Sequence, residues 1–100
     1  MKTSKAVQII SVLSESELKE LDNFINSPYF NSNSNIIRLF GLLKKQYPGF
    51  DAAKIEKELL FGKLFPLKPY NEQIMKNLSS ELLQLLLEFL AINKYRSRNA

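Results

Sequence analysis

The sequence contains no cysteine and no histidine, and its three glycines lie far apart. Without those two residue types the chain has no thiolate nucleophile, no imidazole base, no disulfide, and no nitrogen or sulfur ligands for zinc. Separated glycines do not form a phosphate-binding loop, and the ten carboxylates include no spaced pair in an apolar setting suited to acid chemistry. We therefore expect no catalytic site, no cofactor and no metal, and an enzyme only as part of a longer chain.

Long apolar runs are also missing. The longest are Leu85–Leu87 and Phe89–Ile92, which Glu88 separates, so no segment approaches the roughly 20 apolar residues of a membrane span. The first 13 residues carry two lysines but have neither an extended apolar region nor a small-residue cleavage site, which argues against a secretory signal. We expect a cytoplasmic protein that has no membrane partner.

The remaining composition is that of one small soluble domain covering residues 1–100, with 45% apolar and 24% charged residues. Hydrophobic spacing and turn signals predict an all-α fold, a small helical bundle of four main helices plus a short N-terminal helix, built around a long C-terminal helix. The predicted helices span residues 5–13, 15–27, 35–47, 52–61 and 71–95.

The segment 71–95 is the only one long and apolar enough to form the centre of such a bundle. Spacings of three and four residues place one apolar stripe along it, formed by Met75, Leu78, Leu82, Leu85, Phe89 and Ile92. Leu83, Leu86, Leu87 and Leu90 widen the apolar surface, so the helix needs neighbours on at least two sides. The stripe also matches a coiled-coil seam, but it is shorter than three to four heptads, and bundle core is favoured. We expect near-complete burial of Leu82, Leu85, Leu86 and Phe89.

Local signals mark where the helices begin and end. Ser14-Glu15-Ser16-Glu17 matches a capping box and predicts a helix from Glu15. Pro28 ends that helix, and the Asn/Ser run at 31–35 predicts a loop that caps the next one. Gly62 is expected either to stop the fourth helix or to be a weak point before the pair Leu64-Phe65, and Asn71 is expected to cap the fifth helix.

Two apolar groups lie in predicted irregular segments. Tyr29 and Phe30 either plug the end of the core or form a surface for a partner, and plugging is favoured because aromatic side chains bury so much area. The stiff connection 63–70 has the Pro-x-x-Pro pattern of an SH3 ligand. We expect its apolar side chains to be buried instead: Leu64, Phe65, Leu67 and Tyr70.

Three pieces of sequence together resemble a known family: residues 27–31 (SPYFN), residues 64–71 (LFPLKPYN) and the leucine-rich run that ends at Ala91. The chain is similar, from about residue 13 to 95, to the N-terminal helical region of a family of uncharacterised bacterial proteins, often several hundred residues long. The family has no assigned activity and implies no site residues. The resemblance is consistent with a fragment of a longer protein, in which Lys94, Arg96 and Arg98 are either a basic helix end or the start of a connection.

The missing catalytic residue types favour a non-catalytic protein-interaction or capping module of a larger bacterial protein. Its partner would be another protein or the remainder of its own chain. If the other helices leave Leu83, Leu87 and Leu90 uncovered, these residues form a candidate interface, which a homodimer is one way to cover.

The alternative is a nucleic-acid-binding helical domain that uses a basic face between Arg38 and Lys68. This stretch holds seven basic and three acidic residues, and eight of the eleven aromatics lie between Tyr29 and Tyr70. The candidate phosphate contacts are Lys44, Lys45, Lys54, Lys57 and Lys63. A solvated face explains the same lysines, and the proline connection does not suit a helix-turn-helix, so the interaction module is favoured.

Overall fold

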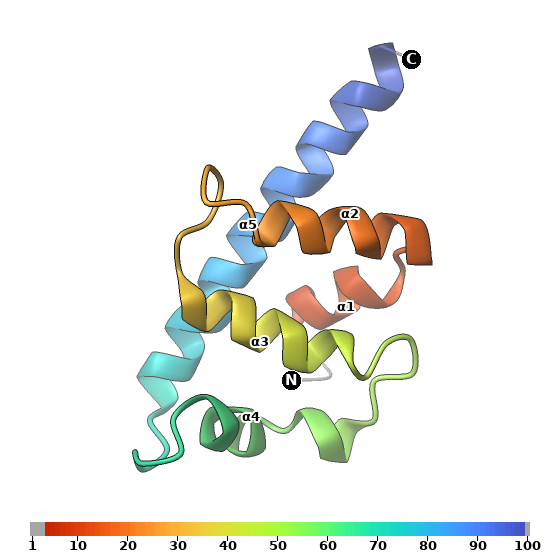
Figure 1. The fold of residues 1–100 in the computed structure, drawn as a ribbon. Coiled ribbons are helices and arrows are strands. Elements are labelled where there is room, and N and C mark those ends of the chain that lie inside the picture. The colour runs from red at the N-terminus through yellow and green to blue at the C-terminus, as the bar shows by residue number, and fades with distance from the viewer. Residues whose placement is uncertain (1–3, 100) are drawn as a thin grey trace.

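The computed structural model describes residues 4–99, with side chains to Asn93, and the described part is helical without a strand (Figure 1). The elements are α1 (Lys5–Ser11), α2 (Glu15–Ile25), α3 (Ser34–Lys44), the 3-10 helix η1 (Ala52–Ile55), α4 (Lys57–Leu64) and α5 (Glu72–Asn99). This confirms the predicted all-α bundle with a long C-terminal helix. No helix in the described range is both long enough and apolar enough to cross a membrane.

The long helix α5 is the element on which the others are assembled. Helices α1, α2 and α3 each pack against it, α2 also contacts α3, and α4 packs on α3 and η1. In Figure 1 the end of α2 and the start of α3 meet α5 at different heights, α1 lies between α2 and α3, and the last turns of α5 extend beyond α2. Leu82 and Leu86 are fully buried on α5, and Leu85 and Phe89 are nearly so. The predicted core face of the central helix is therefore confirmed.

The predicted helix starts are built by side-chain caps. The Ser14 hydroxyl accepts from the Glu17 N–H at 3.1 Å, and the Glu17 carboxylate accepts from the Ser14 N–H at 2.9 Å, which completes the capping box. Asn71 Oδ1 accepts from the Ile74 N–H at 3.1 Å. Asn33 caps α3, with its Oδ1 3.0 Å from the Asn35 nitrogen. These caps satisfy N–H groups that have no partner within the helix.

The single helix predicted for residues 52–61 is wrong. The chain forms η1 and then, after the extended residue Glu56, the separate helix α4, which continues through Gly62 to Leu64. Leu64 lies one turn beyond Phe61, and both are buried, so packing against the core extends the helix past the glycine. The helix stops instead at Phe65, because the residue before Pro66 is driven out of the helical region.

The connection from α4 to α5 is only partly buried. Phe65 and Tyr70 both pack on Phe61, and their ring centroids lie 4.9 and 5.3 Å, respectively, from the centroid of the Phe61 ring. Leu67 is 98% exposed, so its predicted burial is wrong. The Lys68 N–H donates to the Phe65 carbonyl in a turn, and Leu67 lies at the exposed tip of that turn.

The chain also turns sharply after α3, which ends one turn earlier than predicted. Tyr47 follows the helix and its hydroxyl donates to the Leu13 carbonyl, which ties the α1–α2 corner to this turn. Phe50 is buried with a φ of 48°, and its ring meets the Tyr47 ring edge-on at 6.3 Å. Packing of a bulky side chain therefore holds a backbone conformation that such residues rarely adopt.

Candidate docking cleft between α2 and α5

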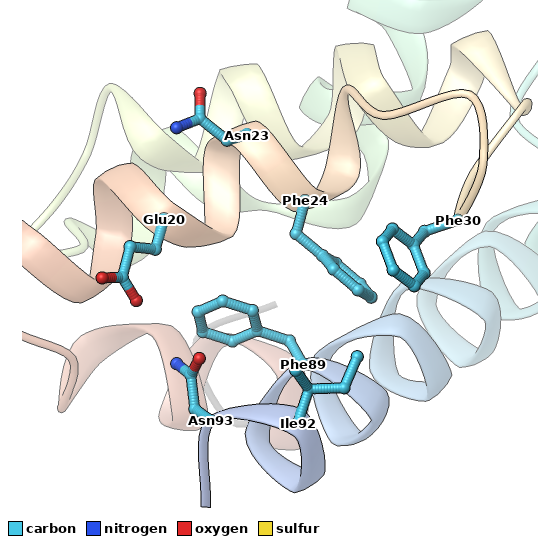
Figure 2. A pocket seen from close by; sticks show the side chains of 7 residues that line it. All are labelled: Glu20, Asn23, Phe24, Phe30, Phe89, Ile92 and Asn93. Atoms are coloured by element: carbon cyan, nitrogen blue, oxygen red, sulfur yellow. The ribbon is translucent and has the colours of Figure 1, made fainter. Parts of the chain in front are cut away.

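A cleft of about 260 Å³ opens between α2 and the second half of α5, beside the loop that follows α2. Figure 2 shows its lining, which consists of Glu20, Asn23, Phe24, Phe30, Phe89, Ile92 and Asn93. In Figure 2 the apolar side chains Phe24, Phe30, Phe89 and Ile92 lie together, and Glu20 and Asn93 lie towards the other end of the cleft. The residues come from two helices and one loop that are far apart in the sequence.

Three phenylalanine rings form the apolar part of the cleft. Phe24 stacks on Phe30, with centroids 4.5 Å apart and planes at 28°, and it meets Phe89 at 5.6 Å in a tilted arrangement. Phe24 and Phe89 are buried, whereas Phe30 is 41% exposed. Tyr29 stands edge-on to Phe30 at 4.9 Å. The aromatic surface thus runs continuously from the core to solvent.

The favoured prediction that Tyr29 and Phe30 plug the core is wrong for Tyr29, which is 88% exposed. The end of the core is already filled by Phe24 and Phe89, and Asn31 is the loop residue that turns inward. Phe30 covers the edge of that core with one face of its ring. The pair therefore forms the surface patch that was the second of the two interpretations.

The loop that carries this pair is held by hydrogen bonds. The N–H groups of Phe30 and Asn31 both donate to the Ser27 carbonyl, at 3.1 and 2.9 Å. Asn31 is buried; its amide Nδ2 donates to the Ile25 carbonyl at 3.0 Å, and its Oδ1 accepts from the Asn33 N–H at 3.1 Å. The Asn33 side chain in turn donates to Glu81 on α5, which fastens the loop to the long helix.

Sequence reasoning explained only part of this loop. The Asn/Ser run was predicted to cap α3, and Asn33 confirms this. The role of Asn31 was missed, although an asparagine directly after two aromatics and two residues before a cap is a signal for a turn closed by its side chain.

Helix α2 is acidic, and so are the described side chains in the second half of α5, although the whole chain has a net charge of +4 and α5 continues with Lys94, Arg96 and Arg98. Helix α2 carries four carboxylates and one lysine, and residues 77–93 of α5 carry two carboxylates and no basic residue. Three of these six are engaged: Asp22 pairs with Lys44 at 3.2 Å, Glu17 accepts in the capping box, and Glu81 accepts from Asn33. The Ser14 backbone N–H, followed by its hydroxyl, lowers the pKa of Glu17 and keeps it charged.

Two carboxylates near the cleft remain without partners. Glu20 and Glu88 are exposed, and neither forms an ion pair or hydrogen bond with another residue in the described part of the chain. Glu20 lines the cleft itself, and Figure 2 shows its carboxylate at the end of the cleft near Asn93. Glu88 precedes Ile92 by four residues, so both lie on one side of α5.

The predicted interface residues of α5 lie on a different side of this helix from Ile92, as their spacing requires. Leu83 and Leu90 are half-buried and Leu87 is 47% exposed. Leu83 borders a hollow of about 120 Å³ that α1 also lines. Neighbouring helices cover much of this group, and unlike the cleft it contains no aromatic side chain. Its role as an interface stays a prediction.

The five candidate phosphate-binding lysines are distributed over α3, the turn of η1 and α4. Lys44 pairs with Asp22, and Lys57 pairs with Glu72 at 3.3 Å, so carboxylates from other helices balance two of the five charges. Lys45, Lys54 and Lys63 are exposed.

A second hollow, of about 300 Å³, lies where the start of α5 meets Lys57. Glu72 is its only lining carboxylate, and it accepts hydrogen bonds from the Tyr70 hydroxyl and from Lys57. The bond to Glu72 raises the pKa of Tyr70 to about 12, and the bond from Tyr70, followed by that from Lys57, lowers the pKa of Glu72. The ion pair offsets the charge of Lys57 here. No cluster of three potential metal ligands occurs in the described part of the chain.

Comparisons of the chain with protein-family models, with curated proteins and with solved structures each found no match. The resemblance to a bacterial family and the cytoplasmic location therefore stay predictions from the sequence. The side chains of Lys94, Arg96 and Arg98 lie outside the described residues, so their predicted role is also untested.

Proposed function

We propose that this domain is a non-catalytic protein-interaction module, and that the cleft between α2 and α5 docks a short amphipathic helix of a partner protein. The observation that carries the proposal is the exposed aromatic pair Tyr29 and Phe30, which a hydrogen-bonded loop presents beside an open apolar cleft. Exposed aromatics on fixed backbone are the residues that dominate binding energy at protein interfaces.

The size of the cleft supports a peptide segment as the ligand. At about 260 Å³ it lies below the usual range of roughly 300–1,000 Å³ for pockets that enclose a small molecule. It suits one or two apolar side chains projecting from a helix, as in helix-in-groove recognition. Burying one exposed aromatic side chain contributes about 1.5–3 kcal/mol, so covering Tyr29 would tighten the binding of a partner by a factor of roughly 10 to 150.

The first test uses a labelled synthetic helix of about 18 residues, with leucine at positions i, i+3, i+4 and i+7 and glutamine at the charge-bearing positions. We expect fluorescence anisotropy to show micromolar binding, with Tyr29→Ser and Phe30→Ala each weakening it about tenfold or more. Leu67→Ser is the matched control, because Leu67 is equally exposed and lies outside the cleft. Absence of binding, or equal weakening by Leu67→Ser, would contradict the proposal.

A second candidate function, nucleic-acid binding, is supported by the exposed Lys45, Lys54 and Lys63, none of which pairs with a carboxylate among the described residues. It is tested by titrating labelled single- and double-stranded DNA and RNA at low and physiological salt. Binding that weakens linearly with the logarithm of salt concentration would favour it. The interaction module is preferred because the cleft combines shape and apolar surface, whereas basic charge alone gives affinity without specificity.

A further inference from the structure

The charge distribution around the cleft specifies the partner more closely, provided that the proposed docking function holds. Among the described side chains, α2 and residues 77–93 of α5 carry six carboxylates and one lysine; Lys94, Arg96 and Arg98 follow on α5, and their side chains lie outside the described residues. The segment 38–68, in contrast, carries seven basic and three acidic residues. An acidic docking surface therefore lies on a chain that is basic overall.

Two of these carboxylates are exposed at the cleft without a partner among the described residues. Glu20 lines the cleft on the α2 side, and Glu88 lies one helical turn before Ile92 on the α5 side. Both are exposed and have no partner in the described part of the chain, whereas Glu17, Asp22 and Glu81 are each held by a hydrogen bond or an ion pair.

We propose that the cleft recognises a cationic amphipathic helix, whose apolar side chains enter between Phe30 and Phe89 and whose lysines or arginines reach Glu20 and Glu88. The aromatic pair also favours a cation, because an arginine guanidinium can stack on the open face of Tyr29 while it pairs with a carboxylate. The basic segment 38–68 disfavours docking of such a helix on its own exposed surface. Charge thus selects both the partner and the surface on which it docks.

The test compares three versions of the same synthetic leucine-patterned helix, with lysine, glutamine or glutamate at the flanking positions. We expect the lysine peptide to bind about tenfold more tightly than the glutamine peptide, and the glutamate peptide about tenfold more weakly. The lysine preference should shrink as salt rises, because rim charges are screened over about 10 Å at 0.1 M ionic strength.

A pair of charge variants assigns that preference to the cleft. Glu20→Gln with Glu88→Gln should reduce the lysine preference, which is the ratio of the affinities for the lysine and glutamine peptides, to threefold or less. Glu56→Gln with Glu58→Gln removes the same charge from exposed residues beside α4 and should change nothing. Circular dichroism of each variant verifies that the helices remain formed.

The outcomes separate this inference from the proposed function. Equal binding of all three peptides would overturn the cationic preference and leave the docking function standing, whereas binding of none would overturn both. A lysine preference that survives Glu20→Gln with Glu88→Gln would place the cationic contact elsewhere and overturn the inference. Concentration-dependent dimers in sedimentation equilibrium that these two substitutions abolish would identify a second copy of the chain as the occupant, and would also overturn it.

Discussion

Replacing Asn31 with alanine tests whether one buried side chain holds the aromatic loop. The change removes a donor to the Ile25 carbonyl at 3.0 Å and an acceptor from the Asn33 N–H at 3.1 Å. The contact of Nδ2 with the Asn33 carbonyl, at 3.5 Å, is too long to contribute much. Leaving a buried polar group without its partner costs about 1–3 kcal/mol. Because Asn33 is only half-buried and water can reach it, we expect a total loss of about 2 kcal/mol.

The assay is urea unfolding followed by far-ultraviolet circular dichroism, with the slope of free energy against urea unchanged. Asn26→Ala is the matched control, since Asn26 donates only to Asp22 at the exposed end of α2, and its loss should cost about 0.5 kcal/mol or less. An Asn31→Ala cost no larger than that of the control would refute the reasoning. Asn31→Ala should also weaken peptide binding, because Phe30 is then no longer held beside Phe24.

Asn31→Asp separates the two hydrogen bonds. The carboxylate can still accept from the Asn33 N–H, but it faces the Ile25 carbonyl without a proton to donate. At neutral pH we expect this variant to be at least as unstable as Asn31→Ala and to recover as the carboxyl becomes protonated at acidic pH. Wild-type stability at neutral pH would show that the bond to Ile25 contributes nothing.

Three further predictions concern the core and the titrating groups. Leu85→Ala should cost about 2–5 kcal/mol in urea unfolding, and a cost below about 1 kcal/mol would contradict the central role of α5. Ser14→Ala should cost about 1 kcal/mol and raise the pKa of Glu17 measured by NMR. Only the part of this loss that depends on the Glu17 charge varies with pH: because the folded-state pKa of Glu17 is lowered, that part is complete above pH 4.5 and is lost as pH falls below it. The bond from the Glu17 N–H to the Ser14 hydroxyl does not titrate, so a stability difference between the two proteins should remain in acid. The contribution of the Tyr70 hydroxyl is present below pH 10 and is lost as pH rises to about 12; Tyr70→Phe should therefore remove the phenol titration near pH 12 and raise the pKa of Glu72.

The features that the sequence predicted correctly are those that depend on near neighbours in the chain. The capping box at Ser14 and the cap at Asn71 are complete within four residues, so local chemistry decides them. The buried stripe of α5 follows from helical spacing alone. These features were sufficient for the fold class and for the central helix.

The features that the sequence did not predict were decided by contacts between distant segments. Gly62 has the local character of a helix stop, yet α4 continues past it to Leu64 because the side chains on either side of the glycine are buried in the core. Tyr29 and Leu67 are as apolar as residues that are buried, but neighbouring rings and turns leave no space for them in the core. The cleft could not be foreseen, because its acidic and aromatic residues belong to α2 and α5, which are separated by some fifty residues.

Helix α4 is attached to α3 and η1, whereas α1, α2 and α3 assemble on α5. This difference should be visible in the rates of amide hydrogen exchange. Opening of the segment from Phe50 to Leu64 leaves the packing of α1 and α2 on α5 intact, so amides of α4 should exchange through a local event of lower free energy than global unfolding. Amides in the buried middle of α5 should exchange only when the whole bundle opens. A ligand in the cleft adds its binding free energy to the second process alone, and α4 should exchange at the same rate with and without it.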